Sequence, residues 1–112
     1  MEREPCVYIQ ARSSHGIFYT GATSNLIQRI YRHRTEYFRG FTAEYGIKRL
    51  VWFKRHETMD AAILREKQIK RWKRPWKYDL IIVMNPKWHD LAEDFGFPPL
   101  PKRKADPGSS PG

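Results

Sequence analysis

The chain has 112 residues, and 21 Lys and Arg against 12 Asp and Glu give it a net charge of +9. No apolar run approaches the ~20 residues of a membrane span, and the first residues lack the pattern of a secretory signal. The single cysteine, Cys6, excludes an internal disulfide and argues against a thiolate zinc site. We therefore expect a cytoplasmic protein, whose charge favours a polyanionic partner, chiefly nucleic acid, although it could serve solubility alone.

The first half of the chain predicts a hairpin, a helix and a third strand. CVYIQAR (6–12) and IFYTGA (17–22) have the composition of strands, and the turn residues 13–16 separate them, as in a β-hairpin. Polar capping residues then precede apolar residues at helical spacing, so we expect a helix over 25–36. IKRLVWFKRHE (47–57) is strand-like because of its β-branched and aromatic residues.

The second half predicts three helices. Thr58 is a candidate N-cap for the helix that carries Glu66. Pro75 would end that helix and occupy the first position of the next, PWKYDLIIVM, although LIIV alone could form a strand. A last short helix would begin at Pro86 and end at Gly96.

This order of elements, ββα–β–ααα, predicts an α+β domain over residues 1–96, with a small three-stranded antiparallel sheet flanked by helices. Residues 97–112, FPPLPKRKADPGSSPG, are rich in proline and glycine. They also carry three consecutive basic residues, Lys102, Arg103 and Lys104. We expect this segment to be a flexible tail.

Glu66 is an acidic residue in an unexpected place. On a helix it shares the apolar face with Ala62, Ile63 and Ile69 and is surrounded in sequence by basic residues. A carboxylate turned toward a core is costly unless a cation or a donor holds it. Glu66 therefore either forms a structural ion pair, with Arg29 or a lysine, or binds a metal ion.

Four other polar residues fall near the predicted hairpin. Alternation along the strands makes Tyr8 and Tyr19 candidates to approach each other across it. Arg29 and His33 are four residues apart and share one face of the first helix. Structural interpretations stay open for both pairs: the tyrosines could be core aromatics whose hydroxyls reach water, and the helix face could be a solvated basic surface.

Together these side chains suit the hydrolysis of a phosphodiester. One inward carboxylate is enough for a single Mg²⁺, which keeps most of its waters, and a guanidinium grips phosphate oxygens in a bidentate manner. A phenol titrates near pH ~10, but a neighbouring metal or arginine could lower its pKa enough for a role as a base.

The same residues carry a family pattern, because the sequence resembles the small stand-alone bacterial members of the GIY-YIG endonuclease superfamily. Cys6-Val7-Tyr8 matches the first half-motif and Tyr19-Thr20-Gly21 the second. The pattern continues through TSNLIQRIYRHR, FTAEYGIKRLVWFKRHET, AAILREKQIKRWKRPWK and MNPKWHDL, so the resemblance covers about residues 5–92. This chain departs from the motif in having Cys6 for glycine and Thr20 for isoleucine, and neither change removes a polar catalytic position.

The resemblance implies a role for each matched residue. It implies that Tyr8 and Tyr19 line the site, one of them assisting deprotonation of the attacking water, and that Arg29 contacts the scissile phosphate. His33 matches a histidine that shuttles a proton or binds phosphate, and Glu66 matches the ligand of a single divalent ion, Mg²⁺ or Mn²⁺.

Two further matches imply supporting roles. Asn85 matches a late asparagine that supports the site. Gly21 matches the motif glycine, where a side chain would crowd the approaching backbone or substrate.

A basic surface would hold the substrate. The run REKQIKRWKRPWKY (65–78) interleaves cations with aromatic residues, on which the bases of a single strand could stack. The alternative is that Trp72 and Trp76 are core residues and only the cations are exposed. The candidate nucleic-acid contacts are Arg32, Arg34, Lys67, Lys70, Arg71, Lys73 and Arg74.

We therefore expect a metal-dependent endonuclease acting on DNA, single-stranded or locally open, in a process such as DNA repair or recombination. A protein partner that confers specificity would complement this small domain. The alternatives are a non-catalytic nucleic-acid-binding module on the same fold and an RNA-directed nuclease. A membrane-surface role is disfavoured, because the basic residues do not line one polar face of an otherwise apolar helix.

Overall fold

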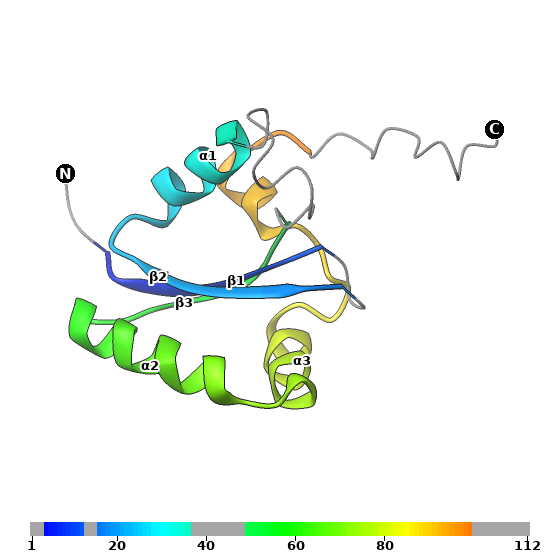
Figure 1. The fold of residues 1–112 in the computed structure, drawn as a ribbon. Helices are drawn as coiled ribbons and strands as arrows, with labels where there is room; N and C mark the ends of the chain where they lie inside the picture. The colour runs from blue at the N-terminus through cyan, green and yellow to red at the C-terminus, as the bar shows by residue number, and fades with distance from the viewer. Residues whose placement is uncertain (1–3, 13–15, 37–48, 100–112) are drawn as a thin grey trace.

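A computed structural model describes residues 4–12, 16–36 and 49–99 of the chain. Its centre is a three-stranded antiparallel sheet with the order β2–β1–β3 (Figure 1). The strands span Cys6–Ala11 (β1), Phe18–Thr23 (β2) and Arg49–Arg55 (β3). β1 and β2 form the predicted hairpin, and β3 pairs with the other edge of β1, so the α+β fold expected from the sequence is confirmed.

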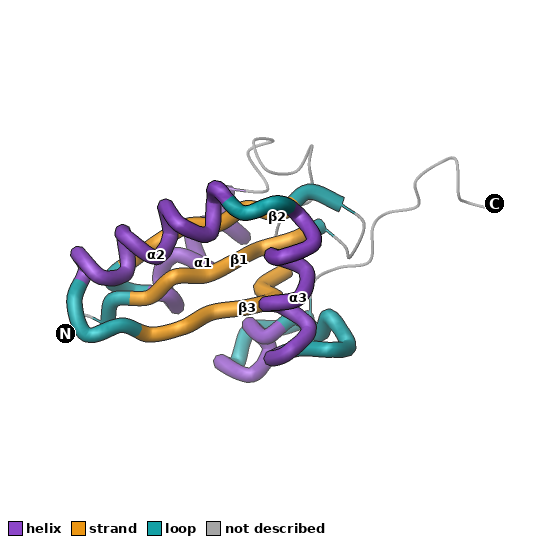
Figure 2. The backbone as a smooth tube through the Cα atoms, turned by 90° about the horizontal axis from the view of Figure 1, so that it is seen from below, coloured by secondary structure: helices purple, strands orange, loops and turns teal. Residues whose placement is uncertain are grey.

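Helices cover both faces of the sheet. α1 (Leu26–Glu36) lies on one face together with the short 3₁₀ helix η2 (Leu91–Phe95), and α2 (Met59–Arg71) and α3 (Arg74–Met84) lie on the other (Figure 1). Seen from below, α2 runs along the β2 side of the sheet (Figure 2). β2 is therefore an edge strand with a helix above it and a helix beneath it.

Alternation along β1 divides the buried residues into two clusters. Val7, Ile9 and Ala11 pack with Ala62, Ile69 and Ile81 on the α2 and α3 side. Cys6 and Tyr8 pack with Leu26, Ile30 and Leu50 beneath α1. β1 is thus buried on both faces, and any polar side chain that it carries must find its partners inside the protein.

Several predicted boundaries are confirmed. Thr58 caps α2, because its hydroxyl accepts a hydrogen bond from the Ala61 N–H at 3.0 Å. Pro75 lies in the first turn of α3, which begins one residue earlier and continues through residues 80–83 as helix rather than strand. Among the described residues no helix is long and apolar enough to cross a membrane.

The predicted start of the last helix is wrong. η2 begins at Leu91 and not at Pro86, because Asp90 caps it by accepting a hydrogen bond from the Ala92 N–H. Residues 85–90 form a turn in which Trp88 has a φ of 56°. Gly96 ends the helix as predicted, in the left-handed conformation with a φ of 95°.

Parts of three predicted elements lie outside the described residues. These are most of the hairpin turn (13–15), the start of the third strand (47–48) and most of the tail (100–112), including its three basic residues.

Candidate active site

The two predicted tyrosines meet on the α1 face of the hairpin. In the antiparallel register Tyr8 lies opposite Gly21 and Tyr19 opposite Gln10, so the two phenols are diagonal neighbours. Their ring centroids are 6.3 Å apart. The predicted approach across the hairpin is therefore confirmed. Tyr8 is buried, with 1% of its surface exposed, whereas Tyr19 is 43% exposed and faces solvent at the sheet edge.

Gly21 makes room for Tyr8. A Cβ atom at this position would lie 2.6 Å from the Tyr8 hydroxyl oxygen, 2.7 Å from Tyr8 Cζ and 3.1 Å from Tyr19 Cε1. The sequence predicted that a side chain here would crowd backbone or substrate. In the structure the space above Gly21 is instead filled by the two phenols, so the glycine seats Tyr8 against the strand.

The Tyr8 hydroxyl is buried without a hydrogen-bond partner among the described residues. Burial raises the pKa of Tyr8, Arg29 opposes this more weakly, and the nearby Tyr19 hydroxyl and Glu66 carboxylate add to the rise. The net shift is upward, so Arg29 alone does not lower the pKa of this phenol enough for a base role. Tyr8 is a neutral phenol at physiological pH, placed close to Arg29, Tyr19 and Glu66.

His33 packs against both tyrosines from α1. Its ring meets Tyr8 and Tyr19 edge-on, at centroid distances of 6.3 and 6.0 Å. The helix is started by Asn25, whose side-chain oxygen accepts a hydrogen bond from the Gln28 N–H, so Arg29 and His33 follow on one face.

Gln10 is a contact that the sequence reasoning missed. Its side-chain oxygen lies 2.5 Å from Nδ1 of His33, and only 1% of the residue is exposed. The available signal was its place two residues after Tyr8 on a buried strand, which puts a polar side chain on the same face as the tyrosines.

Glu66 reaches the same edge from α2. Its side chain is 16% exposed and forms an ion pair with Lys70 at 2.6 Å. Of the predicted neighbours on this helix face, Ala62 and Ile69 are buried, but Ile63 is exposed. Glu66 therefore lies at the border of the apolar stripe and not in its middle. At this border the carboxylate is partly dehydrated and still accessible to solvent.

The donor set suits one hard divalent cation better than a multi-ligand centre. Among the described ranges, no three His, Cys, Asp or Glu side chains gather around one point. Mg²⁺ does not need such a cluster, since one or two carboxylates, waters and substrate phosphates complete its shell. The half-buried Glu66 carboxylate near the orphaned Tyr8 hydroxyl fits that requirement.

Arg34, a predicted nucleic-acid contact, belongs instead to the protein's own framework. Its guanidinium pairs with the buried Asp90 carboxylate at 2.5 Å and donates to the Pro98 carbonyl at 3.1 Å. Asp90 also accepts from the Leu50 N–H at 3.0 Å, which ties α1, β3 and η2 together. Arg34 is therefore removed from the set of residues expected to contact phosphate.

Asn85 supports the fold at the end of α3. Its side-chain nitrogen donates to the carbonyls of Val51 and His89, at 3.2 and 2.7 Å, and its oxygen accepts from the His89 N–H. The structure thus places Asn85 at the junction of β3 with the turn that precedes η2. Its contacts among the described residues are structural ones.

The two tryptophans at the α2–α3 corner differ in exposure. Trp72 packs against the core and is covered by Arg65, which lies 4.9 Å above its ring. Trp76 meets Trp72 edge-on at 6.1 Å and is 60% exposed. The alternative that both are core residues is therefore wrong for Trp76. Arg74 lies 3.9 Å over Phe18, which places this corner beside the start of β2.

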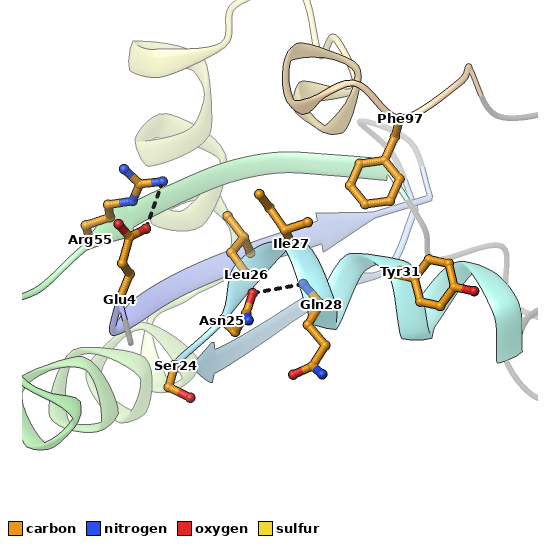
Figure 3. A pocket seen from close by; sticks show the side chains of 9 residues that line it. All are labelled: Glu4, Ser24, Asn25, Leu26, Ile27, Gln28, Tyr31, Arg55 and Phe97. Atoms are coloured by element: carbon orange, nitrogen blue, oxygen red, sulfur yellow. Dashed lines mark hydrogen bonds and ion pairs between the residues drawn. The ribbon is translucent and has the colours of Figure 1, made fainter. Parts of the chain in front are cut away.

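A groove of about 510 Å³ lies apart from the candidate active-site residues (Figure 3). Ile27 and Tyr31 line it from α1 (Figure 3). Helical spacing puts them on a different face from Arg29 and His33, each of which is two positions further along. The Glu4–Arg55 ion pair lies at one end of the groove and Phe97 at the other (Figure 3). None of the predicted catalytic residues lines this groove.

A family model described as the GIY-YIG catalytic domain matches residues 4–79, a range that contains both tyrosines, Arg29, His33 and Glu66. No curated protein and no solved structure matches the chain.

Proposed function

Because the chain belongs to the GIY-YIG family of nuclease domains, we propose that it is a metal-dependent endonuclease that hydrolyses DNA phosphodiester bonds. The observation that supports this most directly is the convergence of Tyr8, Tyr19, His33 and Glu66 at the β2 edge, between α1 and α2. Each is a group that phosphodiester hydrolysis can use, and they come from four different elements.

The proposed mechanism gives each side chain a task that follows from its exposure and charge. Arg29 binds the scissile phosphate, where a fixed guanidinium stabilises the negative charge that develops on the phosphoryl oxygens. Tyr19, exposed at the edge, contacts the attacking water. Tyr8, buried and neutral, donates a hydrogen bond from its otherwise unpartnered hydroxyl.

His33 and Glu66 complete the proposed site. His33 exchanges a proton with the substrate or with water. Glu66 would hold one Mg²⁺ or Mn²⁺, which when bound polarises the phosphate and favours an ionised water. The Glu66 carboxylate is near enough to Tyr8 to affect its pKa, which supports one shared site for the proposed metal ligand and the phenols.

The exposure of Trp76 supports a single-stranded or locally open substrate. An indole ring that is 60% exposed can stack on an unpaired base, and the flanking Lys73 and Arg74 attract the backbone phosphates. Arg74 lies over Phe18, the residue before Tyr19, which supports a path of the bound strand past this corner. Location in the cytoplasm and a partner that confers specificity stay predictions.

The test is a cleavage assay with Mg²⁺ or with chelator on labelled single-stranded DNA, duplex DNA and RNA of mixed sequence. Glu66→Gln should abolish cleavage and retain binding, because the metal ligand is lost while the basic surface remains. Glu57→Gln, which removes an exposed carboxylate before α2, is the matched control and should cleave normally. Trp76→Ala should weaken single-strand binding more than duplex binding.

Two results would favour the alternatives. Binding without cleavage by the wild type on a randomised substrate pool, with and without metal, would indicate a non-catalytic module. Faster cleavage of RNA than of DNA would indicate an RNA-directed nuclease. Metal-dependent DNA cleavage that Glu66→Gln retains would remove Glu66 from its proposed role.

A further inference from the structure

Gln10 contributes an unusual polar group to the centre of the sheet. It lies on β1, which is paired on both edges and buried on both faces, and 1% of its surface is exposed. Its side chain extends toward α1, where the amide oxygen lies 2.5 Å from His33 Nδ1. The amide nitrogen, Nε2, is buried without a hydrogen-bond partner among the described residues.

The chemistry of this contact selects one form of the imidazole. An amide oxygen only accepts hydrogen bonds, so Nδ1 of His33 must carry a proton. In the neutral ring the lone pair then belongs to Nε2, and protonation at Nε2 leaves the Nδ1–H donor unchanged. The hydrogen bond from Nδ1 to Gln10 therefore forms in both charge states of His33. A histidine that gains and loses a proton at Nε2 needs such a partner, because its orientation must not change when its charge does.

The surroundings fix the plane of the ring as well as its tautomer. Tyr8 from β1 and Tyr19 from β2 both meet it edge-on, at interplanar angles of 68° and 74°. Among the described residues, Arg29 on α1 and Glu66 on α2 are charged groups that act on Tyr8. Gln10 is neutral, so it orients the imidazole without adding a charge.

We infer that Gln10 is a positioning residue, which holds His33 as the Nδ1–H tautomer and so assigns proton exchange in the proposed reaction to Nε2. The inference rests on the proposed nuclease function for its catalytic consequence. The tautomer itself is a property of the folded protein and can be measured without substrate.

Because Nε2 of Gln10 is buried and unpartnered, replacing this residue should affect the melting temperature and kcat differently. Methionine has nearly the same shape and buries no unsatisfied donor. Gln10→Met also removes the acceptor of the His33 Nδ1–H, so the gain and the loss oppose each other and the variant should melt close to the wild type. It should nevertheless lower kcat by about 10–100-fold, the size of effect seen when the partner that orients a metal-bound histidine is lost. KM should change little, because Gln10 is buried and touches no substrate.

The experiment combines ¹⁵N NMR of the imidazole nitrogens with single-turnover kinetics and thermal melting. A His33→Gln spectrum assigns the ring among the four histidines of the chain. Wild type should show a protonated Nδ1 and an unprotonated Nε2 at a pH where the ring is neutral, and Gln10→Met should show a mixture of tautomers. Gln10→Glu should keep the Nδ1–H form and move the His33 limb of the pH–rate profile to higher pH, because a carboxylate favours the imidazolium.

Thr20→Val is the matched control, since it removes another buried polar group from the hairpin, on the face away from His33. An Nε2–H tautomer in the wild type would overturn the inference. So would Gln10→Met with an unchanged tautomer and unchanged kcat, or with a kcat that falls only as far as its melting temperature explains. If the wild type cleaves nothing, the nuclease proposal fails, and the NMR result still decides the role of Gln10.

Discussion

Replacing Gly21 with alanine tests whether the seat of Tyr8 is as tight as the geometry indicates. The added Cβ would lie 2.6 Å from the Tyr8 hydroxyl oxygen and 2.7 Å from Cζ, so the phenol must move by roughly 0.8 Å to reach ordinary contact. Tyr8 is enclosed by the sheet and α1 and has little free space into which to move. Overpacking of this kind costs about 1–3 kcal/mol.

That cost corresponds to a fall in melting temperature of roughly 5–20 °C for a domain of this size. Displacement of the phenol should also lower kcat about 100-fold, because misplacing a reacting group by ~1 Å has an effect of that order. The assays are thermal melting followed by circular dichroism and single-turnover cleavage. Tyr8→Leu in the same background should relieve most of the lost stability, since the two side chains compete for one space.

Gly96→Ala is the control for this substitution. Gly96 has a φ of 95° and nothing within 4 Å of the added Cβ, so alanine there is strained by its backbone and not by crowding. It should lower the melting temperature and leave kcat unchanged. A Gly21→Ala variant with the stability and the activity of the wild type would show that the space above Gly21 is free and that Tyr8 is not held there by crowding.

Three further outcomes follow from the buried polar groups. Tyr8→Phe should keep or raise the free energy of unfolding, by removing a hydroxyl without a described partner, and lower kcat; a loss of both would show a structural hydroxyl. Asp90→Ala should lower the free energy of unfolding by about 3–5 kcal/mol, because it removes the partner of the Arg34 guanidinium. Asp90→Asn should lower it less, because the amide oxygen still accepts from the Leu50 N–H. Equal urea midpoints for the two variants would contradict this. Burial raises the pKa of the Cys6 thiol to about 11, above its value in the unfolded chain. The folded protein therefore keeps the thiol protonated at a pH where the unfolded chain loses the proton. The free energy of unfolding is unaffected by this group below pH ~8.5 and falls as the pH rises toward 11. Cys6→Ala should reduce the fall in the free energy of unfolding over that alkaline range, as measured by urea denaturation at a series of pH values. An unchanged pH dependence would exclude the thiol as the cause of the fall.

The periodic features of the sequence predicted most of the fold. Alternation defined the two faces of the hairpin, and helical spacing defined α1 and α2, because each pattern is set by backbone geometry. The last helix was misplaced because proline at a first helical position is only a local preference. In the folded chain, the Asp90 carboxylate is buried between Arg34 and the Leu50 N–H, and these distant contacts decide where η2 begins.

The candidate site was predictable as a set of residues but not as a set of contacts. A helical repeat shows that Arg29 and His33 share a face, and the structure adds which strand residue that face meets. Gln10 was missed because its importance depends on the register of β1 against β2 and on the docking of α1. Arg34 looked like its basic neighbours for the same reason, since its acidic partner is 56 residues away.

Glu66 shows why a structural role and a metal-binding role need not exclude each other. Its partner Lys70 is four residues along α2, and the lysine side chain is 52% exposed. Such a helical pair contributes only about 0.3–0.5 kcal/mol, because the ammonium loses little when it returns to water. In the proposed nuclease, a divalent cation would attract the same carboxylate with twice the charge and would bring a phosphate that Lys70 can then contact. In the free protein the lysine neutralises a half-buried carboxylate at small cost, which would leave Glu66 available for the proposed metal ion.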